Sequence, residues 1–277
     1  MFKCDYHTHS CFSPDAAPES TVEALCHAAI ANGITDLAIT DHFESNWREV
    51  TPLIKFDTNE VYKAVFDAKE KFKDKLNLTF GIEIGQANQC PDEAQRFLQN
   101  CDFEFVISSI HNLKGETDFY YFDFGKIKGT EQQDSYIASL FERNINEICD
   151  AIDVLPIVHT IGHLTYIKRY CAMAGLEYDF SKHAEKAEQL FKKMIAREIA
   201  LEVNVSTLWQ GFDFAMPDTE LLSVYRDCGG RLITVGTDSH SPAHIGEYVS
   251  KGFELIKNIG LNEVLVIRNG ERTVIKI

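Results

Sequence analysis

The sequence predicts an α/β fold: a distorted (β/α)7 barrel, similar in plan to a TIM barrel, followed by a C-terminal β-hairpin. Seven short apolar runs rich in β-branched residues alternate with longer segments of helical periodicity, the pattern of βα units around a parallel sheet. Residues 264–277 contain two apolar runs around Asn269-Gly270, a strong signal for a two-residue hairpin. Because α/β barrels of this length are commonly single units, we expect one domain over residues 1–277.

The predicted strands are the seven apolar runs, and each is followed by polar or helical sequence. In chain order they cover residues 2–6, 35–40, 76–82, 103–110, 155–161, 199–205 and 231–236. Their regular alternation with helical segments indicates that the strands are parallel and that the helices lie outside them.

The predicted helices have readable ends. Ser20 and Glu23 form an S-x-x-E capping box for the first helix, which Gly33 ends, and Asp57 begins the second. Gly229 and Gly260 stand where helix C-terminal caps are expected. Four further helices are predicted, at about residues 131–150, 181–198, 217–228 and 244–258.

The composition limits the possible functions. The formal charge of −15, from 42 acidic and 27 basic residues, argues against nucleic acid or an anionic membrane as a partner. No apolar run approaches the roughly 18 residues of a membrane span, and the start of the chain lacks the pattern of a signal peptide. Eight scattered cysteines without a C-x-x-C pair indicate reduced thiols, so we expect a cytoplasmic protein, of no predicted oligomeric state.

Six of the seven predicted strands end at a potential metal ligand. In such barrels, functional side chains gather at the C-terminal ends of the strands. The sixth strand ends instead at Asn204, which could hydrogen-bond a ligand or substrate. The donors at the other strand ends, with Asp15 near the first of them, are His7, His9, His42, Glu83, His111, His163, Asp238 and His240.

These residue types suit a multinuclear metal centre. Imidazole nitrogens suit zinc, manganese and iron, and carboxylates can bridge neighbouring cations. Nine donors are too many for one tetrahedral ion and would serve two or three divalent ions, an arrangement that activates water and clamps phosphoryl oxygens. The positive charge of such ions would attract a small phosphorylated substrate despite the acidic surface.

The ordered motifs HTHSCFSPDA, TDH, GIEIG, SSIH, GHLTYIKRY, LEVNVS and TVGTDSH resemble the PHP (polymerase and histidinol phosphatase) superfamily, over about residues 3–245. The GHLTYIKRY segment resembles its histidinol-phosphatase branch. The resemblance implies a trinuclear centre held by the nine donors, and attack of a metal-bridging hydroxide on phosphorus. Glu83 is the preferred bridging carboxylate because it lies between the His7–His9 pair and His111 in barrel order, and Asp238 could hydrogen-bond the nucleophile.

The leading hypothesis is therefore a phosphatase that converts L-histidinol phosphate to L-histidinol and phosphate in histidine biosynthesis. The nearest alternative is a PHP phosphoesterase acting on another small ester, such as a nucleotide or sugar phosphate. A catalytically silent metal-binding module would be expected to lack donors, and none is missing. A metal-dependent amidohydrolase is disfavoured because no strand ends at an obvious bridging lysine.

Four residues are candidates for contact with the substrate. Arg169 and Lys168 follow His163 in what we predict to be the same loop, and a guanidinium matches phosphate oxygens; a surface role is the alternative. Arg197 could also bind phosphate, although a cation near a helix C-terminus has a structural explanation. His244 lies close to the site in sequence, whereas we expect His159 to be a hydrogen-bonded interior residue.

Overall fold

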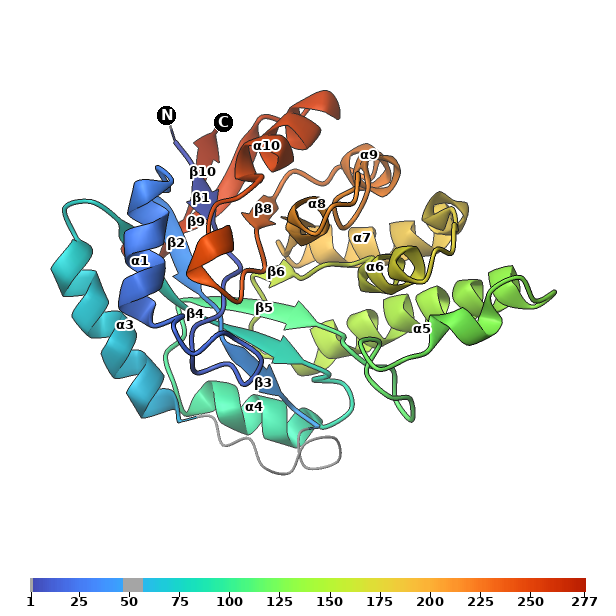
Figure 1. Cartoon of the computed structure of the whole chain (residues 1–277), viewed down its shortest axis with the longest axis horizontal. Helices are drawn as coiled ribbons and strands as arrows, with labels where there is room; N and C mark the ends of the chain where they lie inside the picture. Colours follow the sequence, from blue (N-terminus) through green and yellow to red (C-terminus); the bar gives the residue numbers. More distant parts are fainter. Residues whose placement is uncertain (1, 47–56) are drawn as a thin grey trace.

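The computed structural model describes residues 2–46 and 57–277. Its main sheet is a nearly closed parallel barrel, which confirms the predicted fold class (Figure 1). The Tyr6 N–H donates to the Val235 carbonyl and the Asp238 N–H to the His7 carbonyl, so the last strand returns to the first. The barrel strands, in spatial order, are β1 (Cys4–Asp5), β2 (Asp36–Ile39), β4 (Asn77–Gly85), β5 (Phe105–Ser109), β6 (Thr160–Ile161), β7 (Ala200–Asn204) and β8 (Ile233–Gly236).

A break after β2 distorts the barrel. The chain resumes as a separate strand, β3 (His42–Glu44), which the sequence did not predict. The long strand β4 pairs with both pieces, first with β2 through residues 77–80 and then with β3 through residues 83–85. Opposite His42 in this register lies Glu83, so the pairing brings two predicted donors together.

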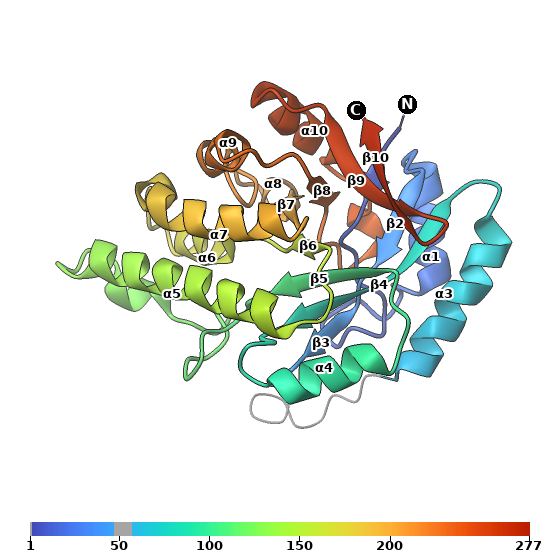
Figure 2. The same cartoon turned by 180° about the vertical axis from the view of Figure 1, so that it is seen from behind.

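The helices lie outside the barrel (Figures 1 and 2). All six predicted helices are present: α1 (Val22–Ala31), α3 (Thr58–Phe72), α5 (Gln133–Val154), α7 (Ala184–Ala196), α9 (Thr219–Asp227) and α10 (Val249–Asn258). The expected starts of the fourth and sixth are instead short 3-10 turns, Phe180–His183 and Pro242–His244. Within residues 2–46 and 57–277, three α-helices were not predicted: α4 (Pro91–Gln99), α6 (Tyr166–Met173) and α8 (Ser206–Trp209). Capping does not separate them from the predicted helices, because α5, α7 and α10 also lack a side-chain cap. α6 and α8 are only eight and four residues long, too short for a clear helical period, whereas α4 has a start signal, Pro91 followed by Asp92 and Glu93, that the prediction did not use.

The predicted capping box of α1 is wrong. Thr21 is the N-cap, and its side chain accepts a hydrogen bond from the Ala24 N–H. The Ser20 hydroxyl instead donates to the His240 carbonyl, which ties the start of α1 to the loop after β8. The prediction for α3 is confirmed, because the Asp57 side chain accepts from the N–H groups of Asn59 and Glu60.

The C-terminal hairpin is formed by β9 (Glu263–Arg268) and β10 (Glu271–Lys276). Asn269 and Gly270 both have positive φ angles, of 53° and 74°, as a two-residue turn with right-handed twist requires. The hairpin packs against the first residues of β2 and β4: Arg268 pairs with Asp36 at 2.7 and 2.8 Å, and Asn77 donates to the Ile267 carbonyl. It therefore covers the end of the barrel opposite the strand C-termini.

No helix within residues 2–46 and 57–277 has the length and apolar character needed to cross a membrane.

We predict that Tyr6→Phe lowers the free energy of unfolding by about 1–3 kcal/mol. The buried Tyr6 hydroxyl accepts from the Ile267 N–H at 2.7 Å and donates to the Ile267 carbonyl at 3.0 Å. The carbonyl keeps its bond from Asn77, but loss of the hydroxyl leaves the buried Ile267 N–H without its acceptor. Urea unfolding would measure the change. Tyr62→Phe on the exposed face of α3 is the control and should change stability by less than about 0.5 kcal/mol; equal effects of the two substitutions would contradict the assigned role.

Candidate metal centre

The nine predicted donors lie together at the C-terminal end of the barrel. Glu83 is at the middle of the group and is fully buried. Its Oε2 lies 2.8 Å from His42 Nδ1 and 3.2 Å from His7 Nε2. Its Oε1 lies 2.9 Å from His163 Nε2 and 3.3 Å from His111 Nε2. The two oxygens thus face different pairs of imidazoles, the placement expected of a bridging carboxylate.

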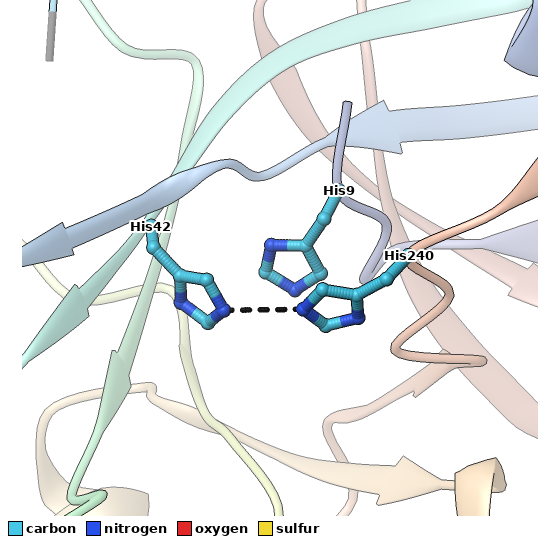
Figure 3. Close-up of side chains that lie close together, drawn as sticks. All are labelled: His9, His42 and His240. Atoms are coloured by element: carbon cyan, nitrogen blue, oxygen red, sulfur yellow. Dashed lines mark hydrogen bonds between the residues drawn. The ribbon is translucent and has the colours of Figure 1, made fainter. Parts of the chain in front are cut away.

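A second group of donors surrounds His9 (Figure 3). The His9 ring stacks on the rings of His42 and His240, each with centroids 4.1 Å away, and the Nε2 atoms of those two lie 3.3 Å apart. Asp15 approaches from its loop, with Oδ2 3.2 Å from His240 Nε2 and 3.6 Å from His42 Nε2. Asp15 lies at the solvent-exposed edge of the group, because 58% of its side chain is exposed.

Asp238 joins the two groups from the end of β8. Its Oδ1 lies 3.3 Å from His9 Nε2 and 3.6 Å from His7 Nε2, while Oδ2 accepts a hydrogen bond from Arg169 at 3.0 Å. Asp238 has φ of 53°, in the left-handed region, and the bond from its N–H to the His7 carbonyl holds this conformation. Unusual backbone conformations of this kind cluster at functional sites.

The donor set fits divalent cations. Four buried atoms that point into the group have no hydrogen-bond partner within the described residues: His7 Nε2, His9 Nε2, His42 Nδ1 and Glu83 Oε2. Buried polar atoms left unpaired are costly, and lone pairs that converge in this way are satisfied by a metal ion. Four overlapping triads each place their donor atoms within 4.8 Å of one another: His9–His42–His240, His7–Glu83–His163, His7–His9–Asp238 and His42–Glu83–His111.

The electrostatics of the centre keep its carboxylates ionised. Burial alone raises the pKa of Glu83, but the imidazoles of His7, His42 and His111 hold it well below its usual value. Burial also opposes ionisation of Asp238, whose pKa is nevertheless lowered by His7, His9 and Arg169. The centre therefore presents anionic oxygens to a cation at neutral pH.

Three residues that the sequence analysis missed hold imidazoles in place. Glu202 Oε1 lies 2.7 Å from His7 Nδ1, and Glu44 Oε1 lies 2.8 Å from His111 Nδ1. Ser13 Oγ lies 3.3 Å from His9 Nδ1 and donates to Asp41. The alternation of side chains along a strand could have indicated two of them. Glu44 lies two residues after His42, and Glu202 lies two residues before Asn204, so each shares a strand face with a residue that the sequence had singled out. Asn204 itself bonds Glu202 and Ser206.

The side chain of Arg169 reaches the centre. The segment around it was predicted to be a loop but is helix α6. Its guanidinium donates to Asp238 and to the Ser206 hydroxyl and lies 5.0 Å from the centroid of the Tyr166 ring. Lys168, on another face of α6, pairs with Asp218 and lies 4.6 Å from the centroid of the Phe214 ring.

The remaining predicted contacts lie away from the clustered donors. His244 stacks on Trp209 with centroids 4.2 Å apart and pairs with Glu247. The structure does not bring Arg197 to the centre: it follows α7 at the amino-terminal end of the barrel and donates to the Ile152 carbonyl at 2.7 Å, near the end of α5. His159 is an interior residue as expected, since its Nδ1 accepts from the Val106 N–H; burial and Arg272 lower its pKa to about 4.

Comparisons with known proteins agree with this architecture. The family model described as PHP domain matches residues 5–206. The histidinol-phosphatase of Lactococcus lactis subsp. lactis (strain IL1403) is 29% identical over 274 residues, covering 95% of this chain and 94% of its own. A probable histidinol-phosphatase of Clostridium acetobutylicum is 25% identical over 262 residues, 94% of this chain and 95% of its own. The crystal structure of a Lactococcus lactis histidinol phosphate phosphatase, complexed with zinc, L-histidinol and phosphate, superposes with a TM-score of 0.78 at 24% identity, covering 99% of this chain and 100% of that one.

We predict that removal of divalent ions with a chelator lowers the melting temperature, and that zinc or manganese restores it. An ion present at 100 times its dissociation constant contributes about 2.7 kcal/mol to the free energy of unfolding. Thermal unfolding of chelator-treated and reloaded protein measures the effect. Calcium, which prefers oxygen ligands, is the control and should restore less. A melting temperature that is indifferent to chelator and to zinc would contradict a metal centre.

Proposed function

Since this chain belongs to the PHP domain family, we propose that it is a metal-dependent phosphatase that hydrolyses L-histidinol phosphate to L-histidinol and phosphate, a reaction of histidine biosynthesis. The observation that carries the proposal is the set of converging donors around Glu83, in a chain that is homologous to histidinol-phosphatases along nearly its whole length. The structure of one relative was determined with histidinol and phosphate, which supports the same ester for this chain.

The nine donors would hold two or three divalent ions of zinc, manganese or iron. Such ions, when bound, lower the pKa of water and stabilise negative charge on phosphoryl oxygens. Glu83 would bridge neighbouring sites, because its two oxygens face different imidazole pairs. Asp238, whose Oδ1 faces His7 and His9, would accept a hydrogen bond from the attacking water and orient it.

Arg169 would bind the phosphoryl group of the substrate. Its side chain is nearly buried, with 10% exposed, and Asp238 and Ser206 hold one end of the guanidinium. Both of these bonds come from the same nitrogen, Nη2, so the guanidinium keeps further N–H donors for a phosphate oxygen. Fixed guanidinium donors match phosphate geometry better than a lysine ammonium does.

Purified protein loaded with zinc or manganese is expected to release phosphate from L-histidinol phosphate much faster than from a nucleotide monophosphate or a sugar phosphate. A phosphate-release assay over this panel measures the preference. Glu83→Ala is the control, and its rate should fall by several orders of magnitude because the bridging carboxylate is lost. Comparable rates on all esters would leave a general PHP phosphoesterase, and preference for another ester would replace the substrate proposed here.

Arg169→Lys is expected to lower kcat/KM by about 10- to 100-fold, because hydrogen bonds to charged groups contribute about 1.5–3 kcal/mol and the lysine cannot keep the planar fork. Steady-state kinetics on L-histidinol phosphate measure the loss. Arg197→Ala, at the other end of the barrel, is the matched control and should retain wild-type kinetics. If Arg169→Lys also retained them, a role for Arg169 in phosphate binding would be excluded.

A further inference from the structure

Glu202 is a buried carboxylate whose two oxygens serve two different strands. It lies in β7, is 1% exposed and is not itself among the converging donors. Oε1 lies 2.7 Å from His7 Nδ1, at the end of β1, and Oε2 accepts from the main-chain N–H of His163, after β6, at 2.6 Å. The Asn204 amide donates to Oε2 at 3.2 Å, so both oxygens are engaged.

The contact with His7 determines which ring nitrogen is available for a cation. An imidazole whose Nδ1 faces a carboxylate carries a proton on that nitrogen, which leaves Nε2 with its lone pair. His7 Nε2 is buried, lies 3.2 Å from Glu83 Oε2, and has no hydrogen-bond partner in the described part of the chain. Glu202 thus turns the coordinating nitrogen of His7 toward Glu83.

The contact with His163 fixes the main chain. His163 has φ of 20°, at the edge of the left-handed region, and the short bond from its N–H to Glu202 holds the turn there. In this conformation His163 Nε2 lies 2.9 Å from Glu83 Oε1. One carboxylate therefore acts on a side chain on one side of Glu83 and on a main-chain turn on the other side.

The neighbouring strand leaves room for this arrangement. At Gly236 of β8, an added Cβ would lie 2.6 Å from Glu202 Oε1 and 2.3 Å from His7 Cβ, both too close for any side chain. A glycine is thus required at the place where the carboxylate meets the imidazole.

We propose that Glu202 is a positioning residue that sets two metal donors at once, by keeping the Nδ1 proton of His7 and by holding the turn of His163. This inference rests on the metal centre of the proposed function and is independent of which phosphate ester is hydrolysed. Glu44 is the matched comparison, because it approaches His111 Nδ1 at 2.8 Å but accepts no main-chain N–H of another donor.

The test is Glu202→Gln in zinc-loaded, ¹⁵N-labelled protein. Glutamine has nearly the same shape, but its single carbonyl oxygen cannot accept from both His7 and His163. We expect zinc affinity, measured by competition with a chelator, to fall about 10- to 100-fold. Proton–nitrogen spectra should show at least one of two changes, according to which way the amide is turned: loss or shift of the His7 Nδ1–H resonance, or faster hydrogen exchange of the His163 amide. Glu44→Gln should alter the His111 Nδ1–H alone, and Glu188→Gln on the exposed face of α7 should alter neither.

Zinc affinity within about twofold of wild type, where a tenfold loss or more is expected, would overturn the proposal, as would unchanged His7 and His163 signals. If Glu202→Gln does not fold, the zinc-loaded wild-type spectrum decides: a slowly exchanging His7 Nδ1–H supports the proposal, and a His7 ring without that proton overturns it. A wild-type protein that binds zinc but releases no phosphate from L-histidinol phosphate would contradict the proposed substrate and leave the role of Glu202 standing.

Discussion

The buried carboxylate of Glu83 is the interaction on which the rest of the centre depends. It faces four imidazoles that come from four separate segments of the chain, and it is fully removed from solvent. A charge at this depth must be balanced by partners, because water cannot reach it. A parallel barrel meets this requirement well, since every strand delivers its last residues to the same end. The local break between β2 and β3 has the same effect, because it brings His42 into register opposite Glu83.

Close packing around the centre depends on glycines, which have no side chain, as much as on the polar side chains beside them. At Gly85 a Cβ would lie 2.2 Å from the Glu44 carboxylate, which supports His111. At Gly162 it would lie 2.4 Å from the Ser109 hydroxyl. Each of these glycines thus leaves room for a polar side chain of a neighbouring segment, and at Gly85 that side chain is the carboxylate that supports His111. Spacing that tight leaves few ways for the donors to move apart.

The barrel and the converging donors could be predicted from sequence because both depend on local pattern. A histidine or carboxylate at a strand end is visible in the sequence, and the fold brings all strand ends together. Glu202 could not be found in the same way because it lies inside β7, and Glu44 because it belongs to β3, a strand that was not predicted; the imidazoles that both contact are distant in the chain. Arg197 shows the converse failure: its residue type suits phosphate, but it precedes β7 instead of following a strand, and so it lies at the wrong end. Helices α6 and α8 were missed because eight and four residues are too few for a clear helical period, whereas α4 was missed although Pro91, Asp92 and Glu93 mark its start.

Because of the C-terminal hairpin, the barrel strands are anchored at one end and present the metal donors at the other. It binds Asp36 and Asn77, the first residues of β2 and β4, and the side chain of Tyr6 directly after β1, while the clustered donors lie at the opposite end of the barrel. The hairpin therefore helps to fix these strands at the end of the barrel away from the donors. Changes in the loops around the donors need not disturb the contacts of the hairpin. Anchoring of the strands at the hairpin end and loop sequence at the donor end are therefore separate properties of the chain.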